Sequence, residues 1–411
     1  MRESQLFLKT KREAPKGVDS VNHELLVRGG FIDQLTAGSW TLLPLGLRVI
    51  NNINGVIREE MNNIGTQEIS MPLLTPRSIW DETGRWEKAK DIMYQFTDSR
   101  HKQHGLAFTH EEVAVDLLRK TVRSYQDLPQ AIYHFSTKFR NEPRAKGGIL
   151  RGREFIMKDL YSVHSTEKDL MNFYDKVKSS YSKIFERLGI GVRVIEASGG
   201  VFTNNHTHEF QVPVGIGEDT IYFCRRCDWG QNKEIFNGAA GDVCPKCERG
   251  KVDESKAIEV ANIFPLGTWF SEKMNFFFED NNGQKKPVWF GSYGIGSTRT
   301  MGAYVEISHD NNGIIWNKTL SPFDVQLIGL PGAQDIEQTY ERLTRSNLDV
   351  LYDDRNIPAG QKFADADLIG IPVRLVASGK TKNQIEWKNR NSNNVEMLNI
   401  EQVVRRLKTR K

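Results

Sequence analysis

The densest group of chemically capable side chains lies at residues 139–159, where a glycine-containing loop joins two predicted strands. Apolar and polar residues alternate before the loop, so Arg140 and Glu142 project from one face of a half-buried strand. The loop and the strand after it carry Arg144, Lys146, Arg151, Arg153, Phe155, Met157 and Asp159. Guanidinium groups held on a sheet suit a polyphosphate, because each can bind two oxygens at once. A solvated basic hairpin would show the same pattern, so the rest of the chain must decide between them.

The four cysteines form a second candidate site. They lie in two C-x-x-C pairs, Cys224/Cys227 and Cys244/Cys247, separated by 16 residues. This spacing matches a tetrahedral four-cysteine zinc site. Four thiolates leave no open coordination position, so the predicted zinc is structural rather than catalytic. The alternative is a set of unligated thiols.

Composition bounds the class of protein. The chain has 411 residues, enough for two or three domains, with 38% hydrophobic and 26% charged residues. A net charge of +4 permits a nucleic-acid partner without demanding one. We find no apolar run long enough to cross a bilayer and no signal or transit peptide. We therefore expect a cytoplasmic protein without a membrane partner.

The elements that must position these residues follow from periodicity. We predict a helix over 46–64 ending at Gly65, a strand over 67–74 that contains Pro72, and a strand and turn carrying Thr109 and Glu111. Further predictions are a helix over 112–122, a helix over 167–189, a strand over 206–210, strands around 258–290, and a glycine-rich strand end at 290–299 that passes into a helix. The upstream part is therefore α+β, with mostly antiparallel strands.

Ser321-Pro322 marks a predicted domain boundary. Beyond it strands and helices alternate, as in a separate α/β module of about 90 residues. The predicted strands are 325–330, 348–352, 373–377 and 384–388, and the predicted helices are 336–346, 360–369 and 400–408.

Three segments, in order, resemble the three signatures of class II aminoacyl-tRNA synthetases. They are the helix and strand ending at Pro72, the Phe139-Arg140-x-Glu142 hairpin with Arg153-Glu154-Phe155, and Gly294-Ile-Gly296-Ser-Thr-Arg299. Further segments resemble bacterial-type prolyl-tRNA synthetases over essentially the whole length. They are Leu43-Pro-Leu-Gly46, Thr109-His-Glu-Glu112, Lys158-Asp159-x-Tyr161-Ser162, Leu266-Gly-Thr268, Asp353-Asp-Arg355 and residues 363–370.

The resemblance implies a domain plan. A class II antiparallel-sheet catalytic domain would span 1–320, and 215–258 would form a small zinc-ribbon-like insert. An α/β anticodon-binding domain would span 321–411. The helix and strand around Pro72 would form a homodimer interface.

It also implies an ATP site. Arg140 would hold the α-phosphate and the prolyl carboxylate, Glu142 would accept from the adenine amino group, and Phe155 would stack beneath the base. Further ATP contacts would come from Arg151, Gly294, Gly296 and Arg299. Arg140 and Arg299 would be the catalytic residues, acting by orientation and charge. Magnesium would bridge the phosphates, and Glu142 is a candidate ligand.

The implied proline site uses Thr109 and Glu111, with Arg140, His208 and Thr268 completing it. A secondary ammonium has two N–H donors, which a carboxylate and a hydroxyl on one strand face can both accept. The implied tRNA contacts in the last domain are Asp353, Arg355, Lys362, Lys388 and Arg390. Each of these charged residues, taken singly, would also fit a solvated surface.

The chain departs from the family pattern in one large way. Full-length bacterial relatives carry an editing domain between the second and third signatures, whereas only about 130 residues separate Tyr161 from Gly291 here. We therefore expect proline activation without editing of alanyl-tRNA in the same chain. Smaller departures are Ala107-Phe108, Ala261-Asn262 and Ser292.

Two other functions compete with proline ligation. A threonyl enzyme would use an open zinc with histidine ligands, unlike the closed four-cysteine set, and a seryl enzyme is a further class II alternative. A synthetase-like regulatory or tRNA-binding paralogue would lose the ATP arginines, yet Arg140, Glu142 and Arg299 are all present.

Overall fold

The computed structural model describes residues 1–7, 9–199 and 207–409, which fall into two compact units. The larger unit comprises Thr36–Ser39 and Asn54–Ala303; the smaller comprises Met1–Leu35, Trp40–Ile53 and Tyr304–Lys411. This division differs from the predicted boundary at 320/321. The start of the chain belongs to the smaller unit because it is bonded to β20 (Val350–Asp353). The Met1 ammonium donates to the Val350 carbonyl at 2.7 Å, and the backbones of Arg2 and Tyr352 form a parallel β-bridge.

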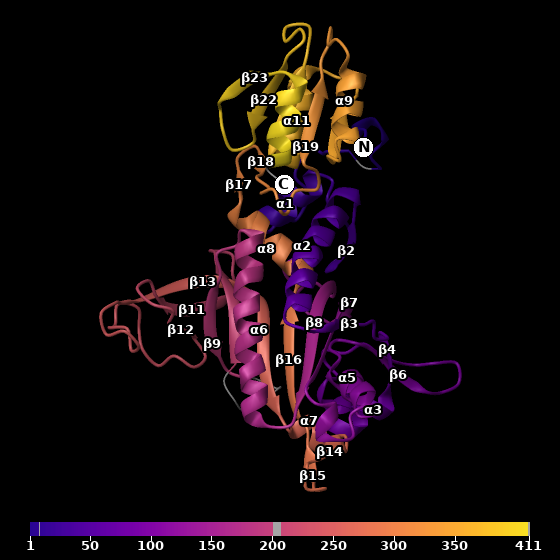
Figure 1. Cartoon of the computed structure of the whole chain (residues 1–411), viewed down its shortest axis with the longest axis vertical. Helices are drawn as coiled ribbons and strands as arrows, with labels where there is room; N and C mark the ends of the chain where they lie inside the picture. The colour runs from indigo at the N-terminus through magenta and orange to yellow at the C-terminus, as the bar shows by residue number, and fades with distance from the viewer. Residues whose placement is uncertain (8, 200–206, 410–411) are drawn as a thin grey trace. The chain divides into compact units, whose positions relative to one another are not determined.

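A nine-stranded sheet, in the order β10-β9-β12-β11-β13-β16-β8-β7-β3, organises the larger unit (Figure 1). Neighbouring strands are antiparallel except for β12 with β9 and β3 with β7. The strands are β3 (Gln67–Glu68), β7 (Gln130–Phe139), β8 (Glu154–His164), β9 (Arg193–Ala197), β10 (Thr207–Pro213), β11 (Asp219–Cys224), β12 (Gly230–Asn232), β13 (Val252–Gly267) and β16 (Trp289–Ile295). The predicted α+β class is confirmed.

Helix α6 (Glu167–Leu188) lies along the sheet, as Figure 1 shows. Its apolar residues recur at helical spacing and are buried, so one face of the helix packs on the strands. The Thr166 hydroxyl accepts from the Asp169 amide and caps the start, and Gly189, at φ +72°, ends the helix. The predicted helix over 167–189 is confirmed.

Smaller elements complete the larger unit. They are a three-stranded sheet of β4 (Leu74–Pro76), β6 (Gln103–Leu106) and β5 (Gln95–Thr97), the hairpin β14 (Phe277–Glu279) and β15 (Lys285–Pro287), and the helices α3 (Arg77–Thr83), α4 (Arg85–Lys88), α5 (Glu111–Leu118), α7 (Trp269–Lys273), α8 (Ser297–Ile307) and η2 (Tyr125–Asp127). A buried cluster of Trp80, Trp86, Ala89, Met93 and Phe108 joins α3, α4 and the small sheet.

Two local predictions need correction. The strand expected over 67–74 pairs only at Gln67 and Glu68, and the chain then leaves the sheet edge at Pro72, whose carbonyl lies 3.1 Å from His110 Nε2. The helix expected over 112–122 is α5, which starts at Glu111 and ends at Leu118.

The strand expected over 206–210 is β10, and His206 lies outside the described residues.

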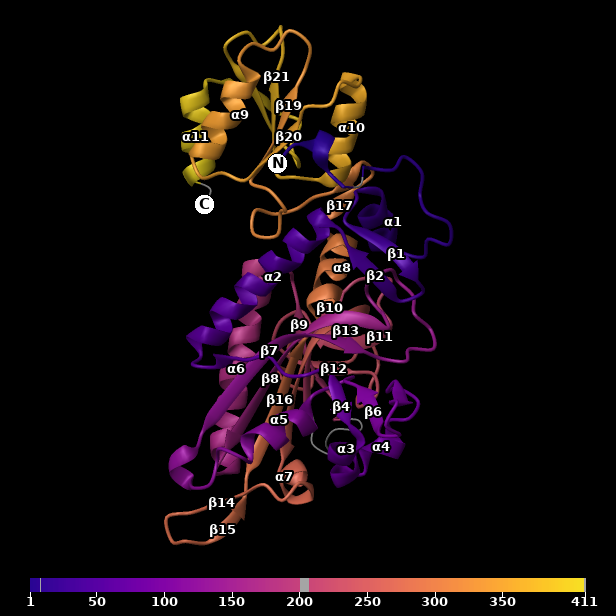
Figure 2. The same ribbon diagram turned by 90° about the vertical axis from the view of Figure 1, so that its right-hand side faces the viewer.

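The smaller unit is built around a five-stranded sheet in the order β20-β19-β21-β22-β23. Strand β19 is parallel to both neighbours, and Figure 2 shows α9 and α11 on one face and α10 on the other. Its elements are β19 (Val325–Gly329), α9 (Ile336–Arg345), β20 (Val350–Asp353), α10 (Ala359–Ile369), β21 (Val373–Ala377), β22 (Ile385–Asn389), β23 (Val395–Leu398) and α11 (Ile400–Thr409). The predicted α/β order is confirmed, and β23 is an additional strand.

The remaining elements are η1 (Glu3–Gln5), α1 (Val21–Arg28), β1 (Ile32–Thr36), β2 (Ser39–Leu42), α2 (Pro44–Asn63), β17 (His309–Asp310) and β18 (Gly313–Ile314). Helix α2 is the helix predicted over 46–64, and Gly65 follows it at φ +84°. None of the described helices is both long and apolar enough to cross a membrane.

Candidate active site

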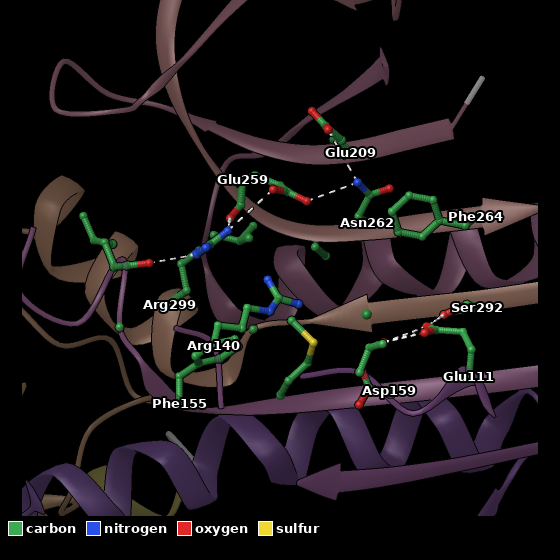
Figure 3. A pocket seen from close by; sticks show the side chains of 18 of the residues that line it. Glu111, Arg140, Phe155, Asp159, Glu209, Glu259, Asn262, Phe264, Ser292 and Arg299 are labelled. Atoms are coloured by element: carbon green, nitrogen blue, oxygen red, sulfur yellow. Dashed lines mark hydrogen bonds and ion pairs between the residues drawn. The ribbon is translucent and has the colours of Figure 1, made fainter. Parts of the chain in front are cut away.

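A cavity of about 390 Å³ opens in the larger unit beside strands β8, β13 and β16 (Figure 3). Antiparallel register places Asp159, Gly294 and Asn262 in one row across the three strands, because Gly294 pairs with both others. The residues that line the cavity include Thr109, Glu111, Arg140, Leu150, Phe155, Met157, Asp159, Glu209, Glu259, Asn262, Phe264, Ser292, Gly294, Gly296 and Arg299. Phe155, Met157 and Asp159 occupy alternate positions of β8 and all line this cavity.

Arg140 follows the end of β7 and reaches into the cavity (Figure 3). Its guanidinium carbon lies 5.2 Å from the centre of the Phe155 ring, and Nε donates to the Phe108 carbonyl at 3.4 Å. Burial and the nearby charge of Arg299 lower the pKa of Arg140. Two cations that face one cavity repel each other, and a bound anion would relieve that repulsion.

Arg299 lies in the first turn of α8, directly after the glycine-rich end of β16. Nε donates to the Leu150 carbonyl and Nη1 donates to the Glu259 carbonyl, both at 2.9 Å. The Glu259 carboxylate lies 3.5 Å from Nη1. Backbone acceptors on two different segments therefore fix the plane of this guanidinium before any ligand arrives.

The opposite end of the cavity holds Glu111 (Figure 3). The Thr109 hydroxyl lies 2.8 and 2.6 Å from its two oxygens, and the Ser292 hydroxyl donates to Oε1 at 3.1 Å. Arg85 Nη1 donates to Oε2 at 3.3 Å. Thr109 and Glu111 do meet, but not on a strand face as predicted: Glu111 begins helix α5, and Thr109 precedes it.

Asp159, between these two ends, is backed by a buried cation. Lys138 contacts Asp159 Oδ2 and His110 Nδ1, and His134 Nε2 lies 3.2 Å from Asp159 Oδ2. Burial would raise the Asp159 pKa, but the Lys138 charge and His134 outweigh it and hold it far below its usual range. Burial, with the charge of Lys138, lowers the pKa of His110 to about 2. Asp159 is therefore an ionised carboxylate at the cavity wall.

The wall across from Asp159 carries two carboxylates that the sequence analysis did not single out. Asn262 donates to Glu259 at 3.1 Å and to Glu209 at 3.4 Å, as Figure 3 shows. Burial, and secondarily the Glu259 charge, raises the pKa of Glu209 to about 8. The alternation of β10 could have indicated Glu209, because it places Glu209 and His208 on opposite faces.

Four predicted site residues are absent from this lining. The His208 Nδ1 is hydrogen-bonded to the Tyr174 hydroxyl at 2.7 Å, on the α6 side of β10. Thr268 donates to Glu272 at 2.7 Å at the start of α7. Arg151 pairs with Glu142 at 2.8 Å and with Glu218 at 2.5 Å, and Arg151 and Glu142 both line an adjacent hollow.

The four cysteines converge between the end of β11, where Cys224 lies, and the start of β13. Their sulfur atoms all lie within 4.8 Å of one another, with Cys224 and Cys247 at 3.8 Å and Cys227 and Cys244 at 3.6 Å. A tetrahedron with Zn–S bonds of about 2.3 Å has sulfurs about 3.8 Å apart, so the geometry fits zinc. Gly250 permits this approach, because a Cβ there would lie 2.4 Å from the Cys224 sulfur.

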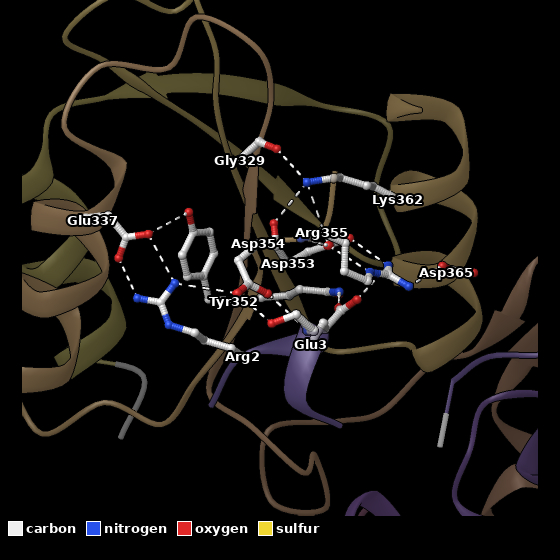
Figure 4. A network of polar contacts seen from close by, with 12 residues as sticks. Arg2, Glu3, Gly329, Glu337, Tyr352, Asp353, Asp354, Arg355, Lys362 and Asp365 are labelled. Carbon is white, nitrogen blue, oxygen red and sulfur yellow. Dashed lines mark hydrogen bonds and ion pairs between the residues drawn. The ribbon is translucent and has the colours of Figure 1, made fainter. Parts of the chain in front are cut away.

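The predicted tRNA contacts of the smaller unit are mostly buried. Figure 4 shows Arg355 between Asp353 and Glu3, at 2.7 and 2.6 Å, with Asp365 at 3.0 Å. Lys362 donates to the carbonyls of Gly329 and Asp353.

Arg390 pairs with Asp310 at 2.7 Å, and its side chain is only 5% exposed. The structure therefore corrects the expectation of tRNA-facing side chains at Asp353, Arg355, Lys362 and Arg390. Lys388, on β22, is only partly buried.

Comparisons with known proteins agree with this geometry. Residues 94–308 match the tRNA synthetase class II core domain (G, H, P, S and T), and residues 326–410 match the anticodon binding domain. The chain is 37% identical to the proline–tRNA ligase of Agrobacterium fabrum over 436 aligned residues, covering 98% of each. It is 32% identical to that of Halothermothrix orenii over 562 aligned residues, covering 99% of each.

The fold also resembles that of a prolyl-tRNA synthetase from Cryptosporidium parvum solved with L-proline and AMP. The TM-score is 0.76 at 19% identity, and the match covers 94% of this chain and 74% of that one. At this identity the likeness concerns the fold alone.

Proposed function

This chain belongs to the proline–tRNA ligase family of class II tRNA synthetases, and we propose that its cavity activates L-proline with ATP and passes the prolyl group to tRNA(Pro). One observation carries the proposal: Arg140 and Arg299 share a cavity with the Glu111 carboxylate. Proline is a zwitterion, so its carboxylate fits beside Arg140 while its ammonium fits beside Glu111. The triphosphate then fits between the two arginines.

The nucleotide end follows from the same contacts. Phe155 offers a ring face for the adenine base, with Arg140 stacked on that ring and Arg299 across the cavity. The missing side chain at Gly294 leaves space in the cavity, since a Cβ there would meet only ordinary contacts at 3.5 Å or more. A Cβ at Gly296 would lie 3.3 Å from the Arg299 Cβ, so glycine there lets Arg299 lie close to the end of the strand. Glu142 and Arg151 lie on the hairpin loop as an ion pair, and we propose that they separate to receive the base and a phosphate.

The reaction needs no side-chain nucleophile. A carboxylate oxygen of proline attacks the α-phosphorus, the bond to the bridging oxygen breaks, and pyrophosphate leaves with the electron pair. The 3′-terminal hydroxyl of tRNA then attacks the prolyl carbonyl, loses its proton, and AMP departs. Arg140 and Arg299 orient the phosphate and stabilise charge on its oxygens as the α-phosphorus becomes five-coordinate.

Magnesium supports such a reaction by neutralising charge on the phosphates. A carboxylate that can reach those phosphates must line the cavity, and Glu259 and Glu209 meet this condition beside Arg299. Glu142, the ligand suggested by the sequence, is paired with Arg151 instead. We therefore propose Glu259 as the magnesium ligand, with Glu209 beside it.

Several finer features remain part of the proposal. Zinc on the four cysteines would hold the short insert closed. The smaller unit would bind the tRNA anticodon stem with Lys388 among its contacts, and α2 with the chain around Pro72 would form a homodimer interface. The enzyme would be cytoplasmic and of bacterial type.

The absence of editing in this chain is also proposed. The alignment to the Halothermothrix orenii enzyme spans 562 positions, more than the 411 residues here, so that relative contains sequence this chain lacks. Residues 207–267, all described, run from β10 to β13 with only β11, β12 and the cysteine pairs between them.

Amino-acid-dependent exchange of labelled pyrophosphate into ATP tests the proposal. Proline should stimulate exchange more than the other standard amino acids do; alanine is also expected to stimulate it. The exchange should not require tRNA. Exchange with threonine or serine alone would indicate another class II specificity. No exchange with any amino acid, alongside retained tRNA binding, would indicate the non-catalytic paralogue.

A further inference from the structure

We infer that Arg85 is a positioning residue for proline binding: its guanidinium holds the Glu111 carboxylate in the orientation that receives the secondary ammonium of the substrate. The inference deepens the proposed function and rests on it, because it takes Glu111 as the group that binds this ammonium. Arg85 is absent from the cavity lining and would act only through Glu111.

Arg85 reaches two carboxylates from behind the cavity. It begins α4, directly after Gly84, which turns the chain at φ +68°. Its Nη1 lies 3.3 Å from Glu111 Oε2 and 3.0 and 3.1 Å from the two oxygens of Glu112. The whole residue is only 8% exposed. A single buried cation therefore serves two consecutive acids at the start of α5.

Three aromatic rings surround this guanidinium. Its central carbon lies 5.8 Å from the Trp80 ring and 5.4 Å from each of the Phe108 and Phe270 rings. Charge-assisted hydrogen bonds are strong in such an apolar setting, and an unpaired carboxylate there is costly. Glu111 consequently depends on Arg85 for one of the hydrogen bonds that its carboxylate accepts.

The other donors leave Glu111 one free direction. Thr109 donates to the carboxylate and Ser292 donates to Oε1. A carboxylate has about four acceptor sites, so three protein donors leave about one for a ligand. One N–H of the prolyl ammonium can take it, and the Thr109 hydroxyl oxygen can accept the second. Loss of the Arg85 bond would let the carboxylate rotate away from this arrangement.

Glu112 has a different role beside Arg85. It is fully buried and also accepts from the Thr83 hydroxyl at 2.9 Å. Burial raises its pKa to about 7, which favours the neutral acid below that pH. Arg85 is then balanced mainly by Glu111, the carboxylate that faces the cavity.

The test is steady-state pyrophosphate exchange with the full chain carrying Arg85→Lys. A lysine ammonium is shorter and lacks the fork of donors, so it cannot reproduce the bond to Glu111. The KM for proline should rise roughly 10- to 100-fold, the range expected for one hydrogen bond to a charged group, while the KM for ATP stays within about twofold. Arg77→Lys is the matched control, because Arg77 lies on α3 beside Trp86 and pairs with Asp81 instead.

A proline analogue separates positioning from general disruption. Tetrahydrofuran-2-carboxylate keeps the ring and the carboxylate but has an ether oxygen in place of the ammonium. Its inhibition constant should change less than about threefold in Arg85→Lys, because it has no N–H for Glu111 to accept. Equal weakening of proline and the analogue, a parallel rise in the KM for ATP, or an unchanged KM for proline would each overturn the inference.

A second variant covers the case in which Arg85→Lys does not fold. Arg85→Gln with Glu112→Gln removes the buried cation together with one buried carboxylate, so it avoids leaving two unpaired acids. It should show the same selective loss of proline affinity, and normal proline affinity would overturn the inference. Absence of proline-dependent exchange in the unmodified enzyme is a different result: it would overturn the proposed function, and the inference with it.

Discussion

Arg140 and Arg299 differ from Arg355 and Arg390 of the smaller unit in how their charge is neutralised. Arg355 and Arg390 have carboxylate partners at 2.6–2.7 Å, whereas Arg299 is held mainly by backbone carbonyls and Arg140 by a ring and one carbonyl. Their positive charge is consequently available to a ligand. This difference in partners, rather than the residue type, separates Arg140 and Arg299, which we propose to bind phosphate, from the ion-paired Arg355 and Arg390.

Arg140→Lys should abolish most of the amino-acid activation. A lysine keeps the charge but loses the fork that can bridge a phosphate and a carboxylate, so proline-dependent exchange should fall roughly 100- to 1000-fold. The matched control is Arg144→Lys in the exposed part of the same hairpin, which should retain exchange without tRNA. Equal rates in the two variants would contradict the assignment of Arg140 to the reaction.

Glu112 should make the stability of the larger unit depend on pH. Burial raises its pKa to about 7, above the ordinary value of a glutamate, so the folded state favours the protonated acid. The raised pKa contributes at most about 3 kcal/mol to the free energy of unfolding. This contribution is fully present below the ordinary pKa of a glutamate and is lost as the pH rises through 7.

Glu112→Gln, which mimics the neutral acid, should therefore gain thermal stability relative to the unmodified protein between pH 5 and pH 8. Melting followed by tryptophan fluorescence at several pH values would measure the difference, because Trp80 is buried on α3, the helix whose Thr83 hydroxyl donates to Glu112. A difference between the two proteins that is constant with pH would contradict the prediction.

The short elements around the cavity show how local structure serves the site. Antiparallel register brings Asp159, Gly294 and Asn262 together from three strands, while the start of α5 presents Glu111 from outside the sheet. Helix α8 begins as β16 ends, which places Arg299 one turn from Gly296. The cavity thus depends on strand ends and helix starts whose positions are set by a rigid sheet.

The cysteine insert depends on one close approach. Gly250→Ala would place a Cβ 2.4 Å from the Cys224 sulfur, so the tetrahedral arrangement of thiolates should open. We expect the variant to lose stoichiometric zinc, measured by elemental analysis, and to melt at a lower temperature. Gly215→Ala is the control, because no atom lies within 4 Å of the position its Cβ would take. Full zinc content in Gly250→Ala would show that the insert tolerates the methyl group.

The two compact units divide charge differently. In the smaller unit, Arg355 forms ion pairs with three carboxylates, which neutralise its charge (Figure 4). They belong to Glu3, Asp353 and Asp365. In the larger unit the cations of the cavity remain open to a ligand. The proposed recognition of tRNA by the smaller unit would therefore use exposed side chains and the backbone rather than this buried network.

Fidelity is a property of the whole chain. A pocket that accepts proline rejects a smaller side chain only weakly, because each lost methylene is worth about 1–3 kcal/mol. We expect alanine to stimulate pyrophosphate exchange and to accumulate as alanyl-tRNA(Pro), measured by acid-gel analysis of charged tRNA. Addition of a deacylase specific for alanyl-tRNA should remove the mischarged product. Exchange with alanine at the background rate would contradict the prediction.

Sequence patterns alone were sufficient for the elements whose signals are local. The periodicity of α6, the alternation in the C-terminal module and the two C-x-x-C pairs all led to the observed elements, because each depends on neighbours in the chain. The motif arginines Arg140 and Arg299 were also predicted this way, and both line the cavity. The strand at 67–74 was overestimated, since pairing there depends on where β7 lies.

Burial and long-range pairing needed the folded chain. Arg355 and Arg140 are the same residue type beside acidic neighbours in the sequence, yet one is neutralised by Glu3 from more than 350 positions away and the other faces a cavity. Arg85 carried no motif signal, and its contact with Glu111 exists only because α3 packs against both α4 and α5. A residue's type states which interactions it can make; the packing of distant segments selects which of them it makes.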